Sequence, residues 1–236
     1  MPEADFTNVD PNDAIDALQR RTDILQPTNS WWEMWQAQHS AAFTVARSAG
    51  FDILSDISSA LDDALKQGTT YEDFIKRIVP ILQEKGWWGR DLGSLRRLKL
   101  IFDTNMRTSY MAGRWASIQR NKEERPYLRY MHTTSEHPRP LHLLWNGITL
   151  PCDHPLWDTH YPPNGWGCKC SVITLSRRQY DAASEAGTIL TEAPKIDWRT
   201  VVNKLTGEIF RVPDGIDPGW GYNVGQAFLK ALGPGG

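Results

Sequence analysis

The residues best suited to chemistry are concentrated in one stretch of the sequence, positions 132–170. This stretch holds all three cysteines and five of the six histidines. Zinc is bound by four ligands drawn from Cys, His and carboxylate side chains, and clusters of these types are typical of its sites. We therefore predict a metal site here. The candidate ligands are His132, His137, His142, Cys152, Asp153, His154, His160, Cys168 and Cys170.

Cys168 and Cys170 form a Cys-x-Cys pair in a segment, Lys169–Leu175, that is predicted to be a strand. Alternate residues of a strand point to the same face, so both thiols could bind one ion. His142 would be a third ligand. A bound ion would be structural, because a loop-rich segment with few apolar residues needs a cross-link. The candidates for the fourth ligand are Cys152, Asp153 and His154.

The alternative is that this stretch binds no metal. Its spacings match no standard zinc finger, and Cys-x-Cys is less specific than paired Cys-x-x-Cys motifs. In that case Cys168 and Cys170 are small buried hydrophobic residues, and the histidines are polar loop residues.

The sequence lacks the motifs of the common catalytic sites. A zinc deaminase needs His-x-Glu followed by Pro-Cys-x-x-Cys, whereas here Glu136 precedes His137 and the cysteine pair is one residue too short. There is no His-Glu-x-x-His helix, no Gly-rich phosphate loop and no Gly-x-Ser-x-Gly turn. A Cys–His nucleophile pair assembled in space stays open. We predict a protein that is not an enzyme.

Composition and charge favour a protein with partners. The 236 residues include 11 Trp, and Trp and Arg are the residue types most enriched at binding hot spots. Residues 1–84 carry 6 basic and 14 acidic side chains, a net of −8, whereas residues 86–130 carry 10 basic and 4 acidic, a net of +6. The basic segment is either a surface for an acidic partner or a solvated helix face. With no signal peptide and no stretch of about 20 apolar residues, we expect a cytosolic protein without a membrane partner.

The fold class indicated by the periodicities is α+β, with a helical N-terminal half followed by a compact, loop-rich module with short strands. Helices are predicted at 11–25, from the Ser30 cap to about 46, at 53–67, at 70–85 with a Thr69/Glu72 capping box, and at 94–120. Strands are predicted at 127–132 and 169–175, followed by a short helix capped by Ser176 and Gln179. The predicted units are an arm and short helix (1–30), a helical region (31–125), the loop-rich module (126–192) and a C-terminal tail (193–236).

The predicted helix at 94–120 carries two distinct faces. One face carries large apolar residues at its start and small residues further along, among them Ser109, Ala112 and Gly113. Small residues permit close helix packing. On the other, Arg96, Arg107 and Arg114 align, and Asp103 is expected to pair with Arg107 at i,i+4.

Six segments, in this order and spacing, resemble the phage Mu F-like head-morphogenesis family over residues 35–175. The first matches that family's TN-x-R-T-x-Y-x-A-G-R helix. Lys169 replaces the usual Arg between the cysteines, and Cys152 lies outside the family pattern, so we take Asp153 as the fourth ligand beside His142 and the cysteine pair. The segments are DTNMRTSYMAGR (103–114), RPYLRY (125–130), RPLH (139–142), WNG (145–147), DHPLW (153–157) and PPNGWGCKC (162–170).

The resemblance implies a minor head (minor capsid) protein of a bacteriophage virion, associated with the portal and the head interior and made in the host cytoplasm. Portal protein, other capsid proteins and packaged double-stranded DNA are the implied partners. The predicted portal or phosphate contacts are Arg96, Arg107, Arg114, Trp87 and Trp88, with Trp31, Trp32 and Trp35 as further candidate anchors.

Each of these assignments has an alternative. Arg107 and Arg114 could instead pair with carboxylates inside the domain, and the tryptophans could be ordinary core, which we favour for Trp35 but not for Trp87 and Trp88. The competing functions are a metal-dependent nuclease or other enzyme that uses the His/Cys cluster, and a nonspecific DNA-binding accessory protein.

Overall fold

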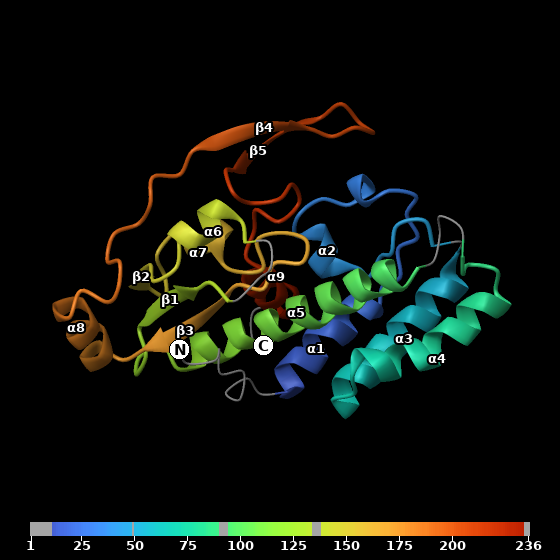
Figure 1. Cartoon of the computed structure of the whole chain (residues 1–236), viewed down its shortest axis with the longest axis horizontal. Coiled ribbons are helices and arrows are strands. Elements are labelled where there is room, and N and C mark those ends of the chain that lie inside the picture. The colour runs from blue at the N-terminus through green and yellow to red at the C-terminus, as the bar shows by residue number, and fades with distance from the viewer. Residues whose placement is uncertain (1–10, 49, 90–93, 134–137, 234–236) are drawn as a thin grey trace.

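The computed structural model describes residues 11–48, 50–89, 94–133 and 138–233, and over these residues the protein has the predicted α+β fold (Figure 1). The helices are α1 (Pro11–Thr22), η1 (Trp31–Glu33, a 3-10 turn), α2 (Gln38–Ala41), α3 (Phe51–Gln67), α4 (Tyr71–Glu84), α5 (Leu95–Arg120), α6 (Pro140–Leu144), α7 (Trp157–His160), α8 (Arg177–Glu185) and α9 (Val224–Leu232). The strands are β1 (Tyr127–Met131), β2 (Thr149–Pro151), β3 (Ser171–Leu175), β4 (Trp198–Val202) and β5 (Ile209–Pro213).

Helix α5 is the element on which both halves of the fold are assembled. Ser94 caps it by accepting a hydrogen bond from the Arg97 amide, as predicted. Its N-terminal half faces the α3–α4 pair, and its C-terminal half lies under the sheet of the second module (Figure 1). Over the described part of the chain, no helix is both long and apolar enough to cross a bilayer.

The first hydrophobic core lies between α1, α3, α4 and the start of α5. The residues at the ends of its helices explain where the helices begin and stop. Gly68 ends α3 with a φ of +62°, a left-handed conformation that glycine adopts without steric cost. The capping box of α4 is Thr70 with Asp73, one residue later than the predicted Thr69 and Glu72. The largest side chains of this core are Phe43, Leu54, Ile57, Phe74, Leu82 and Trp87.

The second core lies between the C-terminal half of α5 and a three-stranded antiparallel sheet of order β2-β1-β3. Leu128 pairs with Leu150 on one side and with Thr174 on the other. The predicted strand at 169–175 begins only at Ser171, so the cysteine pair precedes β3 instead of lying on it. This core also includes residues 212–224, which the sequence assigned to a tail.

One predicted helix, from Ser30 to about residue 46, is not continuous. Ser30 caps a single 3-10 turn through a capping box with Glu33, and the chain is then extended at Met34. Further on, Phe43 and Val45 are buried in the first core, and Phe43 bridges to Leu25. Burial of alternate residues favours an extended backbone, and this tertiary packing overrides the helical periodicity.

Residues after 193 form more structure than the loop and short strand that the sequence predicts. Strands β4 and β5 pair as a hairpin that extends from the body at the top of Figure 1. Helix α9 was not predicted. Its signal was present in Asn223, whose side chain accepts hydrogen bonds from the Gly225 and Gln226 amides as an N-cap.

Helices α1 and α5 cross closely at Gly113, within the predicted stripe of small residues. An added Cβ at this position would lie 2.7 Å from the backbone nitrogen of Ala14 and 2.9 Å from the backbone carbon of Asp13. Both obstacles are backbone atoms, so a larger residue requires that α1 move. The predicted role of the small stripe in close helix packing is thus confirmed.

Gly113→Ala is expected to destabilise the protein by about 1–2 kcal/mol. Alanine gains about 1 kcal/mol of helix propensity, but the overpacking costs about 2–3 kcal/mol, the upper part of the usual range, because backbone atoms of α1 stand in the way. Urea unfolding followed by tryptophan fluorescence measures the difference. The control is Gly221→Ala, where an added Cβ lies 3.5 Å from its nearest neighbour. Wild-type stability in Gly113→Ala would contradict the close crossing.

Candidate metal centre

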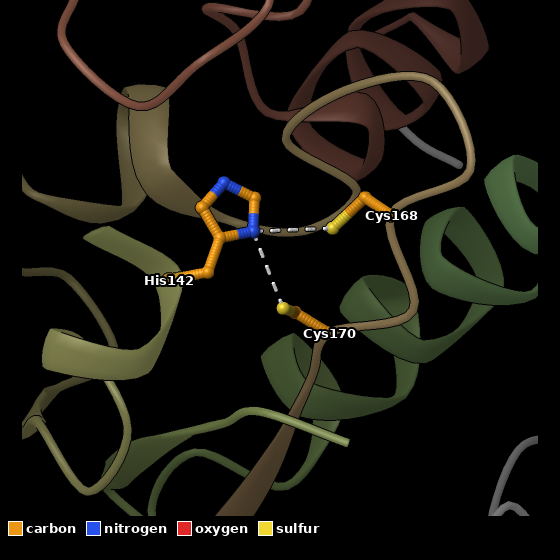
Figure 2. A group of neighbouring side chains, drawn as sticks. All are labelled: His142, Cys168 and Cys170. Atoms are coloured by element: carbon orange, nitrogen blue, oxygen red, sulfur yellow. Dashed lines mark hydrogen bonds between the residues drawn. The ribbon is translucent and has the colours of Figure 1, made fainter. Parts of the chain in front are cut away.

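Three of the predicted ligands, His142, Cys168 and Cys170, converge in the second core (Figure 2). His142 lies on α6, and both cysteines lie in the segment that leads into β3. His142 Nδ1 is 3.7 Å from Cys168 Sγ and 3.4 Å from Cys170 Sγ, and the three ligand atoms lie within 4.8 Å of one another. His142 is only 2% exposed, and each cysteine 3%. One imidazole and two thiols are ligand types that zinc takes, so this group could hold a metal ion.

The orientation of the His142 ring is fixed from outside the group. Its Nε2 donates a hydrogen bond to the Gly215 carbonyl oxygen at 2.8 Å, which leaves Nδ1 as the acceptor that faces the thiols. The ring also stacks on Trp145, with centroids 4.8 Å apart. A ligating histidine usually donates its other nitrogen to a carbonyl or carboxylate in this way. The imidazole is therefore oriented for ligation.

The cysteine segment is tied to α5 by Arg107. The guanidinium donates to the carbonyl oxygens of Lys169 and Cys170, the latter at 2.7 Å, and burial lowers the pKa of Arg107. Arg107 therefore positions the ligand segment. The expected i,i+4 pair with Asp103 is also wrong, because Asp103 pairs with Lys99.

A rigid turn precedes the cysteines. Asn164, fully buried, accepts a hydrogen bond from the Tyr130 hydroxyl at 3.0 Å. The Asp217 carboxylate accepts from the Trp166 amide at 2.9 Å and from Arg139 at 2.7 Å. A Cβ on Gly165 would lie 2.3 Å from Asp217 Oδ2, so this approach requires glycine. Sequence patterns could not identify this contact, because Asp217 is far away along the chain.

The two thiols share their protons unequally. The pKa of Cys168 is lowered, first because the Cys170 thiol donates a hydrogen bond to it. The pKa of Cys170 is raised, first because it is the donor in that bond and then because it is buried. His160, which packs edge-on against Trp145, stays neutral: burial, and then His142, lower its pKa to about 4.

The structure does not bring the predicted fourth ligand, Asp153, to the group. Its side chain is exposed in the turn after β2. Cys152 is buried against the Arg125 carbonyl, and burial raises its pKa to about 11, while His154 Nδ1 accepts from the Leu156 amide. His137 lies outside the described residues.

A cavity of about 400 Å³ opens beside the three ligands. Cationic and neutral groups line it, among them His132, Arg139 and Lys169. The described residues supply three of the four ligands that a zinc ion takes, and all three line this cavity.

The predicted partner contacts are only partly accessible. Arg96 is exposed at the start of α5, but Arg114 is only 9% exposed, so the three arginines do not form one basic surface. Trp87 is 1% exposed and belongs to the first core, which corrects its assignment as a surface anchor. Trp88 is half-buried beside it.

The other candidate tryptophans stack on one another. Ring centroids are 4.0 Å apart for Trp31 and Trp32 and 5.6 Å apart for Trp32 and Trp35. Trp35 packs against the second core and stacks on Phe210 at 4.2 Å, in keeping with the favoured core role. These rings join η1 to the β4–β5 hairpin.

Known proteins resemble this chain over most of its length. The family model described as Phage Mu protein F like protein matches residues 55–173. The chain is 36% identical over 222 residues to the Mu-like prophage FluMu F protein of Haemophilus influenzae, covering 85% of this chain and 53% of that protein. It is 34% identical over 226 residues to protein F of Escherichia phage Mu, whose name proposes a role in capsid assembly, covering 85% of this chain and 51% of that protein. The chain thus spans about half the length of these relatives, and no solved structure matches it.

Arg107→Lys is expected to cost about 1–3 kcal/mol of unfolding free energy, because lysine cannot reproduce the guanidinium's contacts with two carbonyl oxygens. Urea unfolding measures the loss. Arg96→Lys is a matched change at an exposed position of the same helix. Its stability should stay within about 0.5 kcal/mol of wild type, as is usual for surface substitutions. Equal stability of the two variants would contradict the structural role of Arg107.

Proposed function

The chain belongs to the phage Mu protein F-like family, and we propose that it is a bacteriophage minor head protein associated with the portal and the head interior. Family membership supports the coarser role, phage capsid assembly, and through it the other capsid proteins as partners. The observation that carries the proposal is the family match over residues 55–173, which runs from α3 to β3 and includes all three converging ligands.

The role we propose is binding rather than catalysis. The group of His142, Cys168 and Cys170 lies in the second core, and Arg107 connects its cysteine segment to α5. A structural cross-link would be placed in this way. It connects α6 to the start of β3, two segments far apart along the chain. The protein would act in the virion and, during assembly, in the host cytoplasm.

We propose zinc as the ion that His142, Cys168 and Cys170 hold. Two soft thiolates and an imidazole favour zinc over magnesium or calcium, which prefer oxygen ligands. The hydrogen bond from His142 to the Gly215 carbonyl supplies the outer partner that such a ligand needs. When bound, the ion would neutralise the thiolates and cross-link the loop-rich module.

Two of the predicted partner residues remain suited to contact the portal. Arg96 is exposed and Trp88 is half-buried, and they belong to the segments on either side of residues 90–93. An aromatic ring and a guanidinium are a common hot-spot combination. We therefore propose Trp88 and Arg96 as the contacts; Trp87 and Arg114 are buried, and Arg107 is partly exposed and hydrogen-bonded to the cysteine segment, so they are less suited.

Purified protein is expected to contain about one zinc per chain, and chelation should lower its melting temperature by roughly 10 °C, because metal-binding energy contributes to folding. Elemental analysis and calorimetry make these measurements. Cys168→Ser and Cys170→Ser should lose the ion, whereas Cys152→Ser should keep it, since Cys152 lies outside the group. Zinc loss in all three variants alike, or in none, would contradict the assigned ligands.

The protein is expected to co-sediment with rings of the portal protein from the same phage. Arg96→Glu and Trp88→Ala should weaken this association about tenfold or more, the typical cost of losing a hot-spot residue. Arg178→Glu, an equal charge reversal at an exposed position of α8, is the control. If wild-type protein fails to co-sediment, the portal assignment is wrong; if Arg178→Glu is equally impaired, the contact residues are wrong.

A further inference from the structure

A second cavity, of about 560 Å³, lies beside the N-terminal half of α5. Its walls are the segment 29–47, the N-terminal half of α5 and the loop 218–222, with Trp166 shared with the cavity at the metal group. Among the described residues that line it, neither His142 nor the cysteines are found. A volume of this size accommodates a small ligand or a few side chains.

Aromatic rings form much of the wall: Trp31, Phe43, Trp166, Trp220 and Tyr222. The rings hold one another in place, because Trp166 packs edge-on against both Trp31 and Trp220, with centroids 6.3 Å and 5.2 Å apart. Phe43 is 1% exposed and is anchored in the first core. The apolar part of the cavity is therefore preformed and suits an apolar or aromatic group.

Two hydroxyl groups in this cavity have unused hydrogen-bonding capacity. Thr104 and Thr108 line the cavity from α5, and residues four apart on a helix lie on the same face. Their Oγ1 atoms are buried and have no hydrogen-bond partner among the described residues, and Thr108 is only 6% exposed. Buried polar groups are normally satisfied, so two adjacent exceptions in one cavity indicate a polar ligand group.

The charge of the cavity is positive. Arg21 is 7% exposed and donates to Asn105 Oδ1 at 3.2 Å, to Ser109 Oγ at 2.7 Å and to the carbonyl oxygens of Ala17 and Asn105, both at 3.4 Å, all of them neutral acceptors. Arg47 and Arg97 also line the cavity, and no Asp or Glu is found among its described lining residues. Burial lowers the pKa of Arg21 to about 10, and His39 is neutral because burial lowers its pKa to about 4. A buried cation without a counter-charge is costly, and an anion would offset that cost.

We propose that this cavity binds the C-terminal residue of a partner protein, with its free carboxylate at Arg21 and the Thr104 and Thr108 hydroxyls and its apolar side chain among the tryptophans. One apolar C-terminal residue carries both groups on a single α-carbon, which matches donors that lie beside aromatic walls in one small space. Leu100 lines the cavity and is 40% exposed. It adds an apolar rim, which favours a protein segment over a phosphate backbone. The site shares Trp166 with the cavity at the metal group but contains none of the three candidate metal ligands and neither of the proposed portal contacts.

The probes are a hexapeptide Gly-Ser-Gly-Ser-Gly-Phe with a free C-terminus, the same peptide amidated, N-acetylphenylalanine and a thymidine decanucleotide. Isothermal titration calorimetry measures each affinity for the full chain. The free peptide should bind at least about tenfold tighter than the amidated one, because a charge-assisted hydrogen bond is lost on amidation. It should also bind tighter than N-acetylphenylalanine and the oligonucleotide.

Two variants test the location of the site. Thr108→Val, which replaces the hydroxyl by a methyl of similar size, should weaken binding of the free peptide several-fold. Ala42→Trp should abolish it, because Ala42 lines the cavity and an indole would fill it. Thr200→Val, an exposed position on β4, should leave the affinity unchanged.

Equal affinity for the free and amidated peptides, or no saturable binding, would overturn the proposal. Unchanged binding of the free peptide to Thr108→Val would also overturn it. This variant tests the site even if Ala42→Trp fails to fold. Tighter binding of the oligonucleotide than of the free peptide would show a nucleic-acid site and would exclude a protein C-terminus as the ligand. Equal binding of N-acetylphenylalanine would contradict the expected contribution of the residues that precede the terminal one.

Discussion

The close crossing of α1 and α5 is the constraint on which the rest of the structure depends. Helix α5 has 26 residues, which makes it long enough to contribute to two separate cores. Its small residues let α1 and α9 pack against it, and Ala17, Ala112, Ala116 and Phe228 form the small cluster where the three helices meet. On α9, a Cβ on Gly225 would lie 2.0 Å from the Trp115 side chain. Backbones brought this close leave little room for one half of the protein to shift against the other.

The metal group depends on the same helix, although none of its ligands lies there. Arg107 connects α5 to the carbonyl oxygens of the cysteine segment, and the Tyr161 hydroxyl donates to the Met111 carbonyl at 2.8 Å. The hydrogen bond from His142 reaches the Gly215 carbonyl, in the loop after β5. Segments from four parts of the chain thus converge, and a bound ion would reinforce contacts that α5 has already arranged.

The features that depend on residues close together in the chain could be predicted from the sequence. The fold class, the small-residue stripe, the Ser94 and Ser176 caps and strand β1 follow from periodicity and capping, and the structure agrees. His142 and the cysteine pair could be grouped because few residue types bind zinc well. Asp153 could not be excluded in this way, because its exposure depends on how the turn after β2 folds. Trp87 and the extended segment near Phe43 were misjudged for a similar reason, since tertiary packing buries both.

The basic segment 86–130 illustrates why charge counts along a sequence do not locate a binding surface. Several of its arginines use their planar, multi-donor head groups to bind backbone or side chains of distant segments, which lysine could not do as well. Arg125 donates to Thr174 Oγ1 at 2.6 Å, Arg129 to the Thr188 carbonyl at 2.9 Å, and Arg120 pairs with Asp13. Arg107 joins the long helix to the loop-rich module and Arg120 joins it to α1, whereas Arg125 and Arg129 connect strands β3 and β1 with neighbouring segments. The positive charge of this segment therefore contributes mainly to the internal architecture. By contrast, Arg21 on α1 is a buried cation that hydrogen-bonds only to neutral acceptors among the described residues. It lies in the acidic N-terminal third of the sequence, where a count of charges does not reveal it.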